Sequence, residues 1–501
     1  MRSFYVLGIL LFACGTYTQQ IQEILQTTWD RSRLFSPAPS SSPVYFGGRG
    51  AIGSADIVVN DEQVYQTIAG FGASLTDSSA LMLHNLKLEH ADNYWAILRY
   101  MFSPVDGANA AGLNYIRIPL GASDFSASEY SLDDTAGDTT FRYFDINRTP
   151  FYVFSVLQDI RTINYLVKVH ILPWSPPAWM KDSGTMSGGS LLPRYVNIYY
   201  RYLLKAVQGY QNKGIPIYAI SIQNEPMNSN PTYPTCTMPP AVEGRIGAAL
   251  RRVLSSSGFS SVRVIGYEHN WANADTYPIE LMELDGAAFA GVSFHCYAGD
   301  VEEQDIFHDA YPSKEIYFTE CTGTIGTDWW SDIKWYMDNL WIGSLEYWSK
   351  SGLLWNIALD PTGNPKLPGT DSCGGPGCSP LVTIYSDGSY SFNQGFYSMA
   401  QASKAVIPKD RGGPFGQRIG VSVGGDLSWA LRVGAYVTRR ASPNAPLRYT
   451  LVVLNWDDHA DGPWNPVPVY TTIEFRGRQA NPQARYTFPV GVTTLSWYAD
   501  A

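Results

Sequence analysis

Two glutamates in this chain each close a short apolar run. The stretch YAISIQNEP (218–226) reads as a strand that ends in Asn224 and Glu225, and EIYFTE (315–320) ends in Glu320. Glutamate is rarely buried without a partner, so a carboxylate at the end of a buried strand is either solvated or has a chemical task. One task that needs two carboxylates is cleavage of a glycosidic bond, in which one protonates the departing oxygen and the other attacks or stabilises C1.

Each of these motifs is weak when it stands alone. Asn-Glu-Pro at 224–226 also reads as a solvated strand end followed by a proline stop, and Thr-Glu-Cys at 319–321 is shorter still. Together the two motifs indicate a catalytic site only if the fold brings them close in space. Their meaning therefore depends on the strands and helices that carry them.

Eight apolar runs alternate with helix-like stretches such as 193–211, 242–256 and 396–406. This alternation predicts a (β/α)₈ barrel over residues 66–406, with parallel strands that are covered on both faces. Glu225 then ends strand 4 and Glu320 ends strand 7, both at the end of the barrel that carries active sites. The eight runs are 66–72, 114–120, 166–174, 217–223, 262–268, 291–297, 315–320 and 352–359.

The texture changes after the last predicted helix. Residues 407–501 alternate apolar and polar positions and are broken by Gly, Asn, Asp and Pro, which predicts an antiparallel β-sandwich. We expect residues 19–65 to contribute to this domain in part, with a strand near 51–59, and we interpret the Pro/Ser stretch 36–42 as a linker.

Other polar and aromatic residues also fall at the predicted strand ends. Asn224 is placed to hydrogen-bond a sugar 2-OH, and Tyr297 to orient the strand-7 carboxylate. A structural reading stands beside this one: Asp77 and Asp124 fit helix caps, and histidines such as His269 and His295 fit hydrogen-bonded structural residues. Also at strand ends are Arg117, Trp174, Glu268, Asn270, Trp355 and Asn356.

The motifs, in this order, resemble family-30 glycoside hydrolases over the whole barrel. They are GFGASLTD (70–77), IRIPLGASDFS (116–126), PWSPPAWMK (173–181), QNEP (223–226), HCY (295–297), TEC (319–321) and LWNIAL (354–359). The resemblance implies a retaining β-glycosidase with Glu225 as acid/base and Glu320 as nucleophile. It also implies a sugar subsite lined by Arg117, Asp124, Trp174, Asn224, Tyr297 and Trp355, to which we add His269 as a predicted substrate contact.

The loop 369–383 and the HCY and TEC motifs look like the fungal branch that acts on β-1,6-glucan. Endo-hydrolysis of β-1,6-glucan is therefore the leading hypothesis. Glucosylceramidase, β-1,6-galactanase and xylanase activities are alternatives within the family, and a non-catalytic carbohydrate-binding protein is an alternative outside it. Retention requires carboxyl groups about 5–5.5 Å apart, and we expect Glu320 and partial burial to raise the pKa of Glu225. No metal or cofactor is expected.

The amino-acid composition argues against some classes of binding partner. The formal charge is −10, charged residues are 16% of the chain, and Lys and Arg form no run, which argues against nucleic acid or an anionic membrane. Aromatic residues reach 14%, with 15 Trp and 33 Tyr, which fits either stacking on a neutral hydroxyl-rich ligand or a Tyr-rich core. We expect a polysaccharide substrate and a monomeric protein.

Residues 1–18 read as a secretory signal peptide, because the apolar run from Phe4 to Ala13 is too short to span a bilayer. The chain is therefore expected to be extracellular with no stable membrane anchor, and Asn147-Arg148-Thr149 is its predicted glycosylation site. The Gly/Pro loop between Cys373 and Cys378 predicts a local disulfide. Cys296 and Cys321 either pair or remain buried thiols, and Cys236 has no assigned partner.

Overall fold

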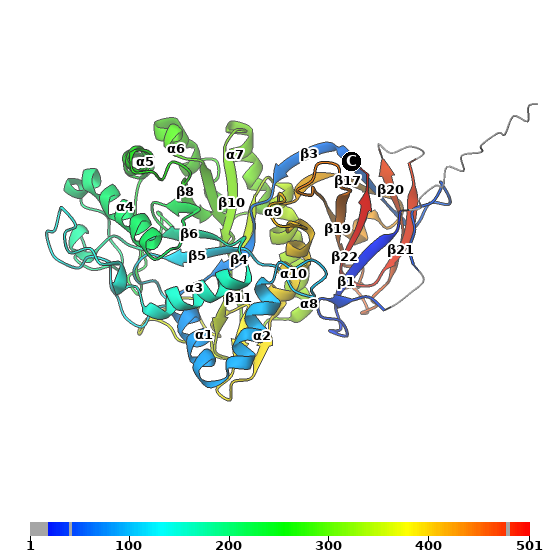
Figure 1. Cartoon of the computed structure of the whole chain (residues 1–501), viewed down its shortest axis with the longest axis horizontal. Helices are drawn as coiled ribbons and strands as arrows, with labels where there is room; N and C mark the ends of the chain where they lie inside the picture. Colours follow the sequence, from blue (N-terminus) through cyan, green and yellow to red (C-terminus); the bar gives the residue numbers. More distant parts are fainter. Residues whose placement is uncertain (1–18, 40–42, 477–480, 501) are drawn as a thin grey trace, which may run out of the picture.

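The computed structural model describes residues 19–39, 43–476 and 481–500, and the predicted signal peptide lies outside them. Figure 1 shows two packed parts: a barrel on the left and a second sheet domain on the right, with helices α8, α9 and α10 between them. No helix in the described part of the chain is both long enough and apolar enough to cross a membrane.

The barrel sheet has eight parallel strands that follow one another in chain order, which confirms the predicted fold class. Two hydrogen bonds close the ring between its seventh and eighth strands: Lys350 N donates to Ile316 O at 2.8 Å, and the side chain of Ser351 donates through Oγ to Phe318 O at 3.0 Å. The strands are β4 (Gly70–Ser74), β5 (Tyr115–Pro119), β6 (Lys168–Leu172), β7 (Ala219–Ser221), β8 (Arg263–Asn270), β9 (Gly291–His295), β10 (Glu315–Glu320) and β12 (Ser351–Asn356).

The first barrel strand differs from the predicted run 66–72. Residues up to Thr67 belong to β3 (Ala55–Thr67) of the other domain, and the barrel strand begins at Gly70. Gly70 has φ +138°, and a Cβ there would lie 2.0 Å from the Asn114 amide oxygen, so only glycine permits the turn from one domain into the other.

Ten α-helices are assigned among the described residues, and most cover the outside of the barrel (Figure 1). Thr76 caps α1 by accepting a bond from Ser79 N at 3.0 Å, and Asp328 caps α8 by accepting one from Ser331 N at 2.8 Å. The helices are α1 (Asp77–Glu89), α2 (Ala91–Phe102), α3 (Phe151–Ile163), α4 (Val196–Asn212), α5 (Pro240–Ser256), α6 (Tyr277–Asp285), α7 (Gln304–Ala310), α8 (Trp329–Trp335), α9 (Gly343–Glu346) and α10 (Gln394–Val406).

The barrel core is rich in tyrosine. Seven tyrosines of the described barrel are fully buried, so part of the high aromatic content serves packing rather than ligand binding. They are Tyr94, Tyr115, Tyr199, Tyr202, Tyr210, Tyr267 and Tyr317.

The second domain is a nine-stranded, mostly antiparallel sheet that encloses a core of its own. Both ends of the chain contribute: β1 (Ile21–Thr28) pairs with β22 (Gly491–Ala499), and β3 pairs in parallel with β20 (Val469–Arg476). That parallel pair departs from the predicted antiparallel pattern. The remaining strands are β2 (Ser36–Pro37), β17 (Gln417–Gly424), β18 (Leu431–Thr438), β19 (Leu447–Asn455) and β21 (Gln483–Phe488).

The predicted linker 36–42 is wrong at its start, because Ser36 and Pro37 form β2 and pair with β1. Two small sheets shape the barrel's active end. β11 (Gly323–Thr324) pairs with β14 (Cys378–Ser379), which ties the cysteine loop to the segment that follows Glu320. β13 (Ala358–Leu359), β15 (Val382–Ile384) and β16 (Tyr390–Phe392) form the other.

Candidate active site

A cleft of about 650 Å³ opens at the carboxyl ends of the barrel strands. Eight of the nine residues predicted to act on or bind substrate line it, and the ninth, Arg117, lies fully buried against them. The eight are Asp124, Trp174, Asn224, Glu225, His269, Tyr297, Glu320 and Trp355.

The Glu320 carboxylate is held at both oxygens. Arg117 Nη1 pairs with Oε2, and the Tyr297 hydroxyl donates to Oε1 at 2.9 Å. The Tyr297 side chain is 43% exposed at the cleft mouth while its hydroxyl reaches inward to the carboxylate. A carboxylate fixed by a cation and a hydroxyl is oriented without having to reorganise, which suits an attacking group.

Glu225 lies just beyond the short strand β7 in a strained loop. Its φ is +45°, and its backbone N–H donates to Glu268 O at 3.0 Å. Tyr267 and Glu268, on the neighbouring strand, also have positive φ, of 73° and 47°. Such conformations cost of order 1–3 kcal/mol each and persist where the surroundings over-determine them. The strained backbone conformations therefore cluster at the residues that direct Glu225 into the cleft.

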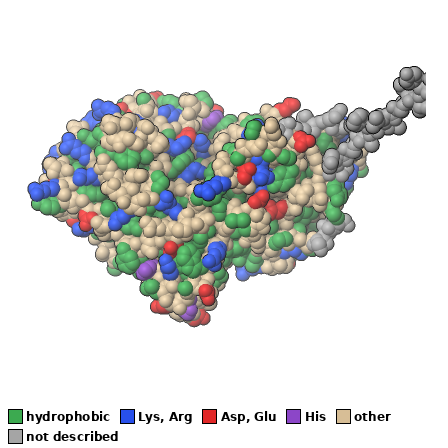
Figure 2. Space-filling model, viewed as in Figure 1, with side chains coloured by type: hydrophobic (Ala, Val, Ile, Leu, Met, Phe, Trp, Pro, Cys, Tyr) green, Lys and Arg blue, Asp and Glu red, His purple; other side chains and the backbone are tan. Residues whose placement is uncertain are grey.

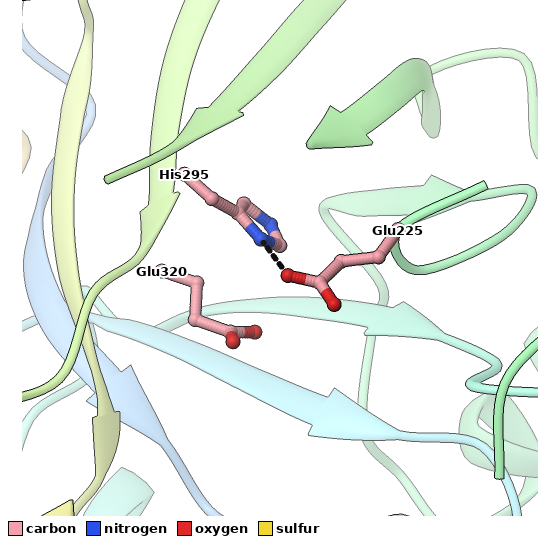
Figure 3. Close-up of side chains that lie close together, drawn as sticks. All are labelled: Glu225, His295 and Glu320. Carbon is pink, nitrogen blue, oxygen red and sulfur yellow. Dashed lines mark hydrogen bonds and ion pairs between the residues drawn. The ribbon is translucent and has the colours of Figure 1, made fainter. Parts of the chain in front are cut away.

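Glu225 and Glu320 face each other across the cleft beside His295 (Figure 3). One carboxylate oxygen from each glutamate and one imidazole nitrogen of His295 all lie within 4.8 Å of one another. Retaining glycosidases place their carboxyl groups about 5–5.5 Å apart, whereas inverting enzymes need about 6.5–9.5 Å to admit a water. The spacing lies close to the retaining range and well short of the inverting one.

His295 joins Glu225 to a third carboxylate. Its Nδ1 lies 3.2 Å from Glu225 Oε1 and its Nε2 lies 3.2 Å from Glu268 Oε2. Burial alone would lower the pKa of His295, but the negative charge of Glu320 and the bonds to Glu225 and Glu268 raise it to about 9. The imidazole is therefore a cation at neutral pH.

The expectation that the pKa of Glu225 is raised is wrong in this resting structure. Burial raises it, but the hydrogen bond and charge of His295, with smaller contributions from His269 and Asn228, lower the pKa of Glu225 below its ordinary value. Near neutral pH the proton of the Glu225–His295 pair therefore rests on the imidazole. Asn228 Nδ2 fixes the other oxygen, Glu225 Oε2, at 2.8 Å.

Glu268 is the fully buried anchor of this network and had no role assigned from sequence. Its Oε2 accepts from Arg117 Nη2 at 3.1 Å and from Thr319 Oγ1 at 2.7 Å, and its Oε1 accepts from Ser221 Oγ at 2.6 Å. Burial raises its pKa, but the charge of Arg117 and the bond from His295 hold the pKa well below the usual range. Its position as the last residue of the predicted strand 262–268, beside His269, was the available signal.

An aromatic platform forms the opposite part of the cleft. The rings of Trp174 and Trp355 stack at 4.8 Å with an interplanar angle of 15°, and the Arg117 guanidinium lies 4.8 Å from the Trp174 ring. Asp124 sits beside them, where its Oδ2 accepts from Ser372 Oγ and from Trp355 Nε1 at 3.4 Å. Its Oδ1 is buried and has no partner among the described residues, which leaves an acceptor for a ligand hydroxyl.

The same cleft environment affects the remaining titratable contacts. Burial, and then the charge of Glu320, raise the pKa of Asp124 to about 7, against the lowering effect of Ser372. Burial lowers the pKa of His269 to about 4, so that side chain is neutral, and its buried Nδ1 has no partner in the described structure. Asn224 Oδ1 accepts from Arg117 Nη2 at 2.5 Å, which orients the amide.

Two loops supply cleft residues that the sequence analysis did not single out. Asn230 Nδ2 and Thr232 Oγ1, from the loop after Glu225, both donate to Asp371 Oδ1 of the cysteine loop, at 3.0 and 2.6 Å. The missed lining residues are Asn228, Asn230, Tyr233, Thr322, Gly323, Thr324, Asp371 and Ser372. The Asn-rich stretch directly after Glu225 was the signal that could have found the first two.

Two disulfides stabilise the active end. Cys373 pairs with Cys378 within its loop, and Cys296 pairs with Cys321, which settles the pairing that the sequence left open. The second bridge joins the residue after His295 to the residue after Glu320. Cys236 is a buried free thiol.

The structure also bears on the predicted helix caps and on the predicted glycosylation site. Asp77 is not the helix cap, which is Thr76; instead its Oδ2 accepts from Ser126 Oγ at 2.6 Å and Tyr130 OH at 3.0 Å. Asp124 starts no helix and serves the cleft. Asn147 is exposed, with its side chain bonded to Asp145 and Lys213.

The triad Glu225, His295 and Glu320 has a spacing that a metal ion could bridge. Both nitrogens of His295 already face carboxylates, with Nδ1 3.2 Å from Glu225 and Nε2 3.2 Å from Glu268. Arg117 at Glu320 places a positive charge beside the same point, which opposes a cation there. The donor set therefore fits proton transfer better than metal binding.

A (β/α)₈ barrel with two carboxylates of this spacing in an aromatic-lined cleft defines a glycoside hydrolase. The chain belongs to glycosyl hydrolase family 30, whose TIM-barrel domain matches residues 68–406. It is 31% identical over 409 residues to an endo-1,6-β-D-glucanase of Neurospora crassa, covering 78% of each chain. It is 23% identical over 334 residues to the lysosomal acid glucosylceramidase of Mus musculus, covering 62% of this chain and 63% of that one.

Among solved structures, the endo-β1,6-glucanase BT3312 superposes with a TM-score of 0.78 at 26% sequence identity. The match covers 97% of this chain and 99% of that one, so the similarity includes the second domain as well as the barrel.

Proposed function

We propose that the protein is a secreted, retaining endo-hydrolase of β-1,6-glucan, with Glu225 as acid/base and Glu320 as nucleophile. The observation that carries this proposal is the separation of at most 4.8 Å between facing carboxylate oxygens of Glu225 and Glu320. That separation leaves room for direct attack on a sugar C1 and too little for an intervening water.

In the first step Glu320 attacks C1, and the bond from C1 to the departing oxygen breaks as Glu225 delivers a proton to that oxygen. The proton comes from the Glu225–His295 pair, which holds one proton at neutral pH. As the oxygen gains negative charge it becomes the stronger base, so the proton moves from His295 through Glu225 to the sugar. Arg117 and Tyr297 keep Glu320 oriented.

In the second step Glu320 is an ester and its negative charge is gone. The Glu225–His295 pair has given up its proton, so Glu225 accepts one from an incoming water that attacks C1 and releases Glu320. The pair returns to its starting state. Trp174 and Trp355 supply an apolar face for the sugar ring, and Asp124 Oδ1 and the Asn224 amide supply hydroxyl partners.

Two of the similar proteins support β-1,6-glucan as substrate, since both the Neurospora crassa relative and BT3312 are described as acting on that linkage. Incubation with pustulan, a linear β-1,6-glucan, is expected to release gentio-oligosaccharides, with the β-anomer appearing first by NMR. Appearance of the α-anomer first would contradict retention. Release of glucose from glucosylceramide, without action on pustulan, would transfer the assignment to glucosylceramidase.

Secretion is supported by the two disulfides, which persist in oxidising compartments. We propose that residues 1–18 are removed on export, that Asn147 is exposed for glycosylation, and that the mature protein is a monomer. N-terminal sequencing of protein from the culture medium, with light scattering for its mass, tests these points. Retention of the protein inside cells would contradict the first of them.

A further inference from the structure

A groove outside the catalytic cleft lies where the barrel meets the second domain. It consists of two adjoining hollows of about 810 and 400 Å³, which share Ser331, Lys334 and Ala460 in their walls. One wall is α8 of the barrel, and the other comes from η8 (Ser428–Ala430) and the loop after β19. Figure 1 shows α8 between the barrel and the nine-stranded sheet. We call this feature the tryptophan groove.

The groove gathers the exposed tryptophans of the molecule. Among the described residues, three tryptophans are strongly exposed: Trp335 at 41%, Trp429 at 58% and Trp464 at 47%. Trp335 and Trp429 line the larger hollow and Trp464 lines the smaller one. Single exposed apolar residues are ordinary, but a contiguous set of large ones marks a binding surface.

The backbone at two of these tryptophans is fixed by hydrogen bonds, and the ring of the third packs on another tryptophan. Trp456 Nε1 donates to the backbone oxygen of Trp429 at 2.8 Å, and Asn339 Nδ2 donates to the backbone oxygen of Trp335 at 3.0 Å. Trp29 packs edge-on against Trp464, with ring centroids 5.0 Å apart. A surface whose backbone is already ordered loses less conformational freedom when a ligand stacks on it.

The polar groups between the tryptophans indicate the ligand. Lys334, Asp338 and Asp461 line the larger hollow together with the rings, and ion pairs hold Lys334 to Asp458 at 2.6 Å and Asp338 to Arg432 at 2.9 Å. Charged residues are depleted at the cores of protein–protein interfaces, so this mixture is poorly suited to a second protein. A sugar chain offers flat C–H faces for tryptophan rings and hydroxyl groups for carboxylates and an ammonium group, and both hollows have the volume of ligand sites.

We propose that the tryptophan groove is a second glycan site, which holds a neutral β-linked glucan chain while another part of the same polymer occupies the cleft. Thr324 lines the cleft, and α8 begins five residues later at Trp329, at most about 18 Å along the chain. A polymer that reaches both sites gains by effective concentration, whereas a short oligosaccharide fills only the cleft. The choice of glucan rests on the proposed function; the existence of the site does not.

The test compares polymer binding with hydrolysis of a short substrate. The variants are Trp335→Ala/Trp429→Ala, Trp429→Tyr, which keeps an aromatic face, and Tyr470→Ala, which removes an exposed aromatic on β20 outside the groove. Each is made in the otherwise intact chain for hydrolysis of gentiotetraose, and with Glu320→Gln for binding to immobilised pustulan. Thermal unfolding checks that each variant is folded.

The double variant is expected to bind pustulan about tenfold more weakly, a loss of about 1.4 kcal/mol, while kcat/KM for gentiotetraose stays within about twofold of the parent. Trp429→Tyr and Tyr470→Ala should keep most of the pustulan binding. Unchanged pustulan binding in the double variant overturns the proposal. So does a shift in sedimentation from dimer to monomer without a change in pustulan binding, which would make the groove an interface between two copies.

Failure of the proposed function has a different signature. A parent enzyme that hydrolyses no β-1,6-glucan but cleaves another β-glycan in a panel contradicts the proposed substrate alone. The binding comparison is then made on that glycan, where a weaker double variant still supports the groove and an unchanged one overturns it.

Discussion

His295 Nδ1 lies 3.2 Å from Glu225 Oε1, and the imidazole carries the proton that the pair shares near neutral pH. This pairing reverses the simple picture of an acid/base glutamate that holds its own proton through burial. Glu268 anchors the other side of the ring, so the imidazole is held by carboxylates on two sides. The proton therefore lies on His295, one hydrogen bond away from the Glu225 oxygen that delivers it.

Substitution of His295 should therefore move the pH profile. The pKa of His295 is raised to about 9, so loss of the pair's proton sets the alkaline limb of kcat/KM near that pH. In His295→Gln, Glu225 has no neighbouring imidazolium to hold the shared proton, so the alkaline limb should shift to lower pH. A profile that keeps its alkaline limb and only falls in height would contradict the role of His295 in holding the proton.

The same group contributes to stability in a defined pH window. A raised folded-state pKa means that the contribution is fully present below the unfolded pKa near 6.5 and is lost as pH rises through about 9. Wild-type stability should fall over that window, measured by urea unfolding, and His295→Gln should show a weaker fall. Equal slopes for the two proteins would argue against the imidazolium.

Removal of each proposed catalytic carboxylate should give a distinct result. Glu225→Ala is expected to lower kcat by about 10²–10⁴-fold on substrates with poor leaving groups, because protonation of the departing oxygen is lost. Aryl glycosides, which need little protonation, should lose less in the first step, and azide should restore turnover with a β-glycosyl azide product.

Glu320→Gln keeps the shape of the site but removes the nucleophile, so hydrolysis should collapse on every substrate while binding to pustulan survives. Survival of hydrolysis would contradict the nucleophile assignment. If wild type and Glu320→Gln bound glucan alike and neither hydrolysed any glycan, the protein would be a binding protein without turnover.

The features of this site that the sequence could predict are those whose residue pattern lies within single segments of the chain. Glu225 and Glu320 follow apolar strands, and the barrel rule places all strand ends together, so their meeting was predictable. The pairing of Cys296 with Cys321 could also have been predicted, because these residues directly follow adjacent barrel strands. The bridge from His295 to Glu268 was not, because it depends on side-chain distances between buried groups.

The fold likewise contains features that local sequence patterns predict and features that they do not. Alternating apolar and polar residues predicted the strands of the second domain, but alternation is the same for parallel and antiparallel pairs. The parallel pairing of Ile57 with Ile473 joins residues more than 400 positions apart and could not be read from either segment. Similarly, no local pattern indicated that Trp335 and Trp429, from different domains, line one hollow.

Asp124 offers a specific test of substrate binding. Its Oδ1 is buried and unpartnered among the described residues, so a sugar hydroxyl is expected to donate to it. A hydrogen bond to a charged group contributes about 1.5–3 kcal/mol, so Asp124→Asn should lower kcat/KM about 10- to 150-fold. Because burial raises the pKa of Asp124 to about 7, the loss should be larger above pH 7, where the wild-type group is ionised. A pH-independent loss would contradict this role.

Tyr297 should affect the reaction through Glu320 rather than through binding. Its hydroxyl donates to Glu320 Oε1 at 2.9 Å, and Tyr297→Phe removes that bond while keeping the ring at the cleft mouth. We expect kcat to fall by about tenfold or more, with little change in KM, measured on gentio-oligosaccharides. Tyr470→Phe, which removes an exposed tyrosine hydroxyl on β20 outside the cleft, is the matched control and should leave kcat unchanged. A change confined to KM would instead make Tyr297 a sugar contact.

The two disulfides should differ in what they stabilise. Cys296–Cys321 closes 25 residues and Cys373–Cys378 closes 5, so loop entropy assigns them about 3.5 and about 2 kcal/mol. Replacing the first pair with serine should lower the urea midpoint more than replacing the second. It should also lower kcat, because Cys296 and Cys321 directly follow His295 and Glu320. The second pair lies in the cleft loop beside Asp371, so its loss should act mainly on KM. If the two double variants instead lost kcat equally, the bridge next to Glu320 would have no special part in aligning the carboxylates.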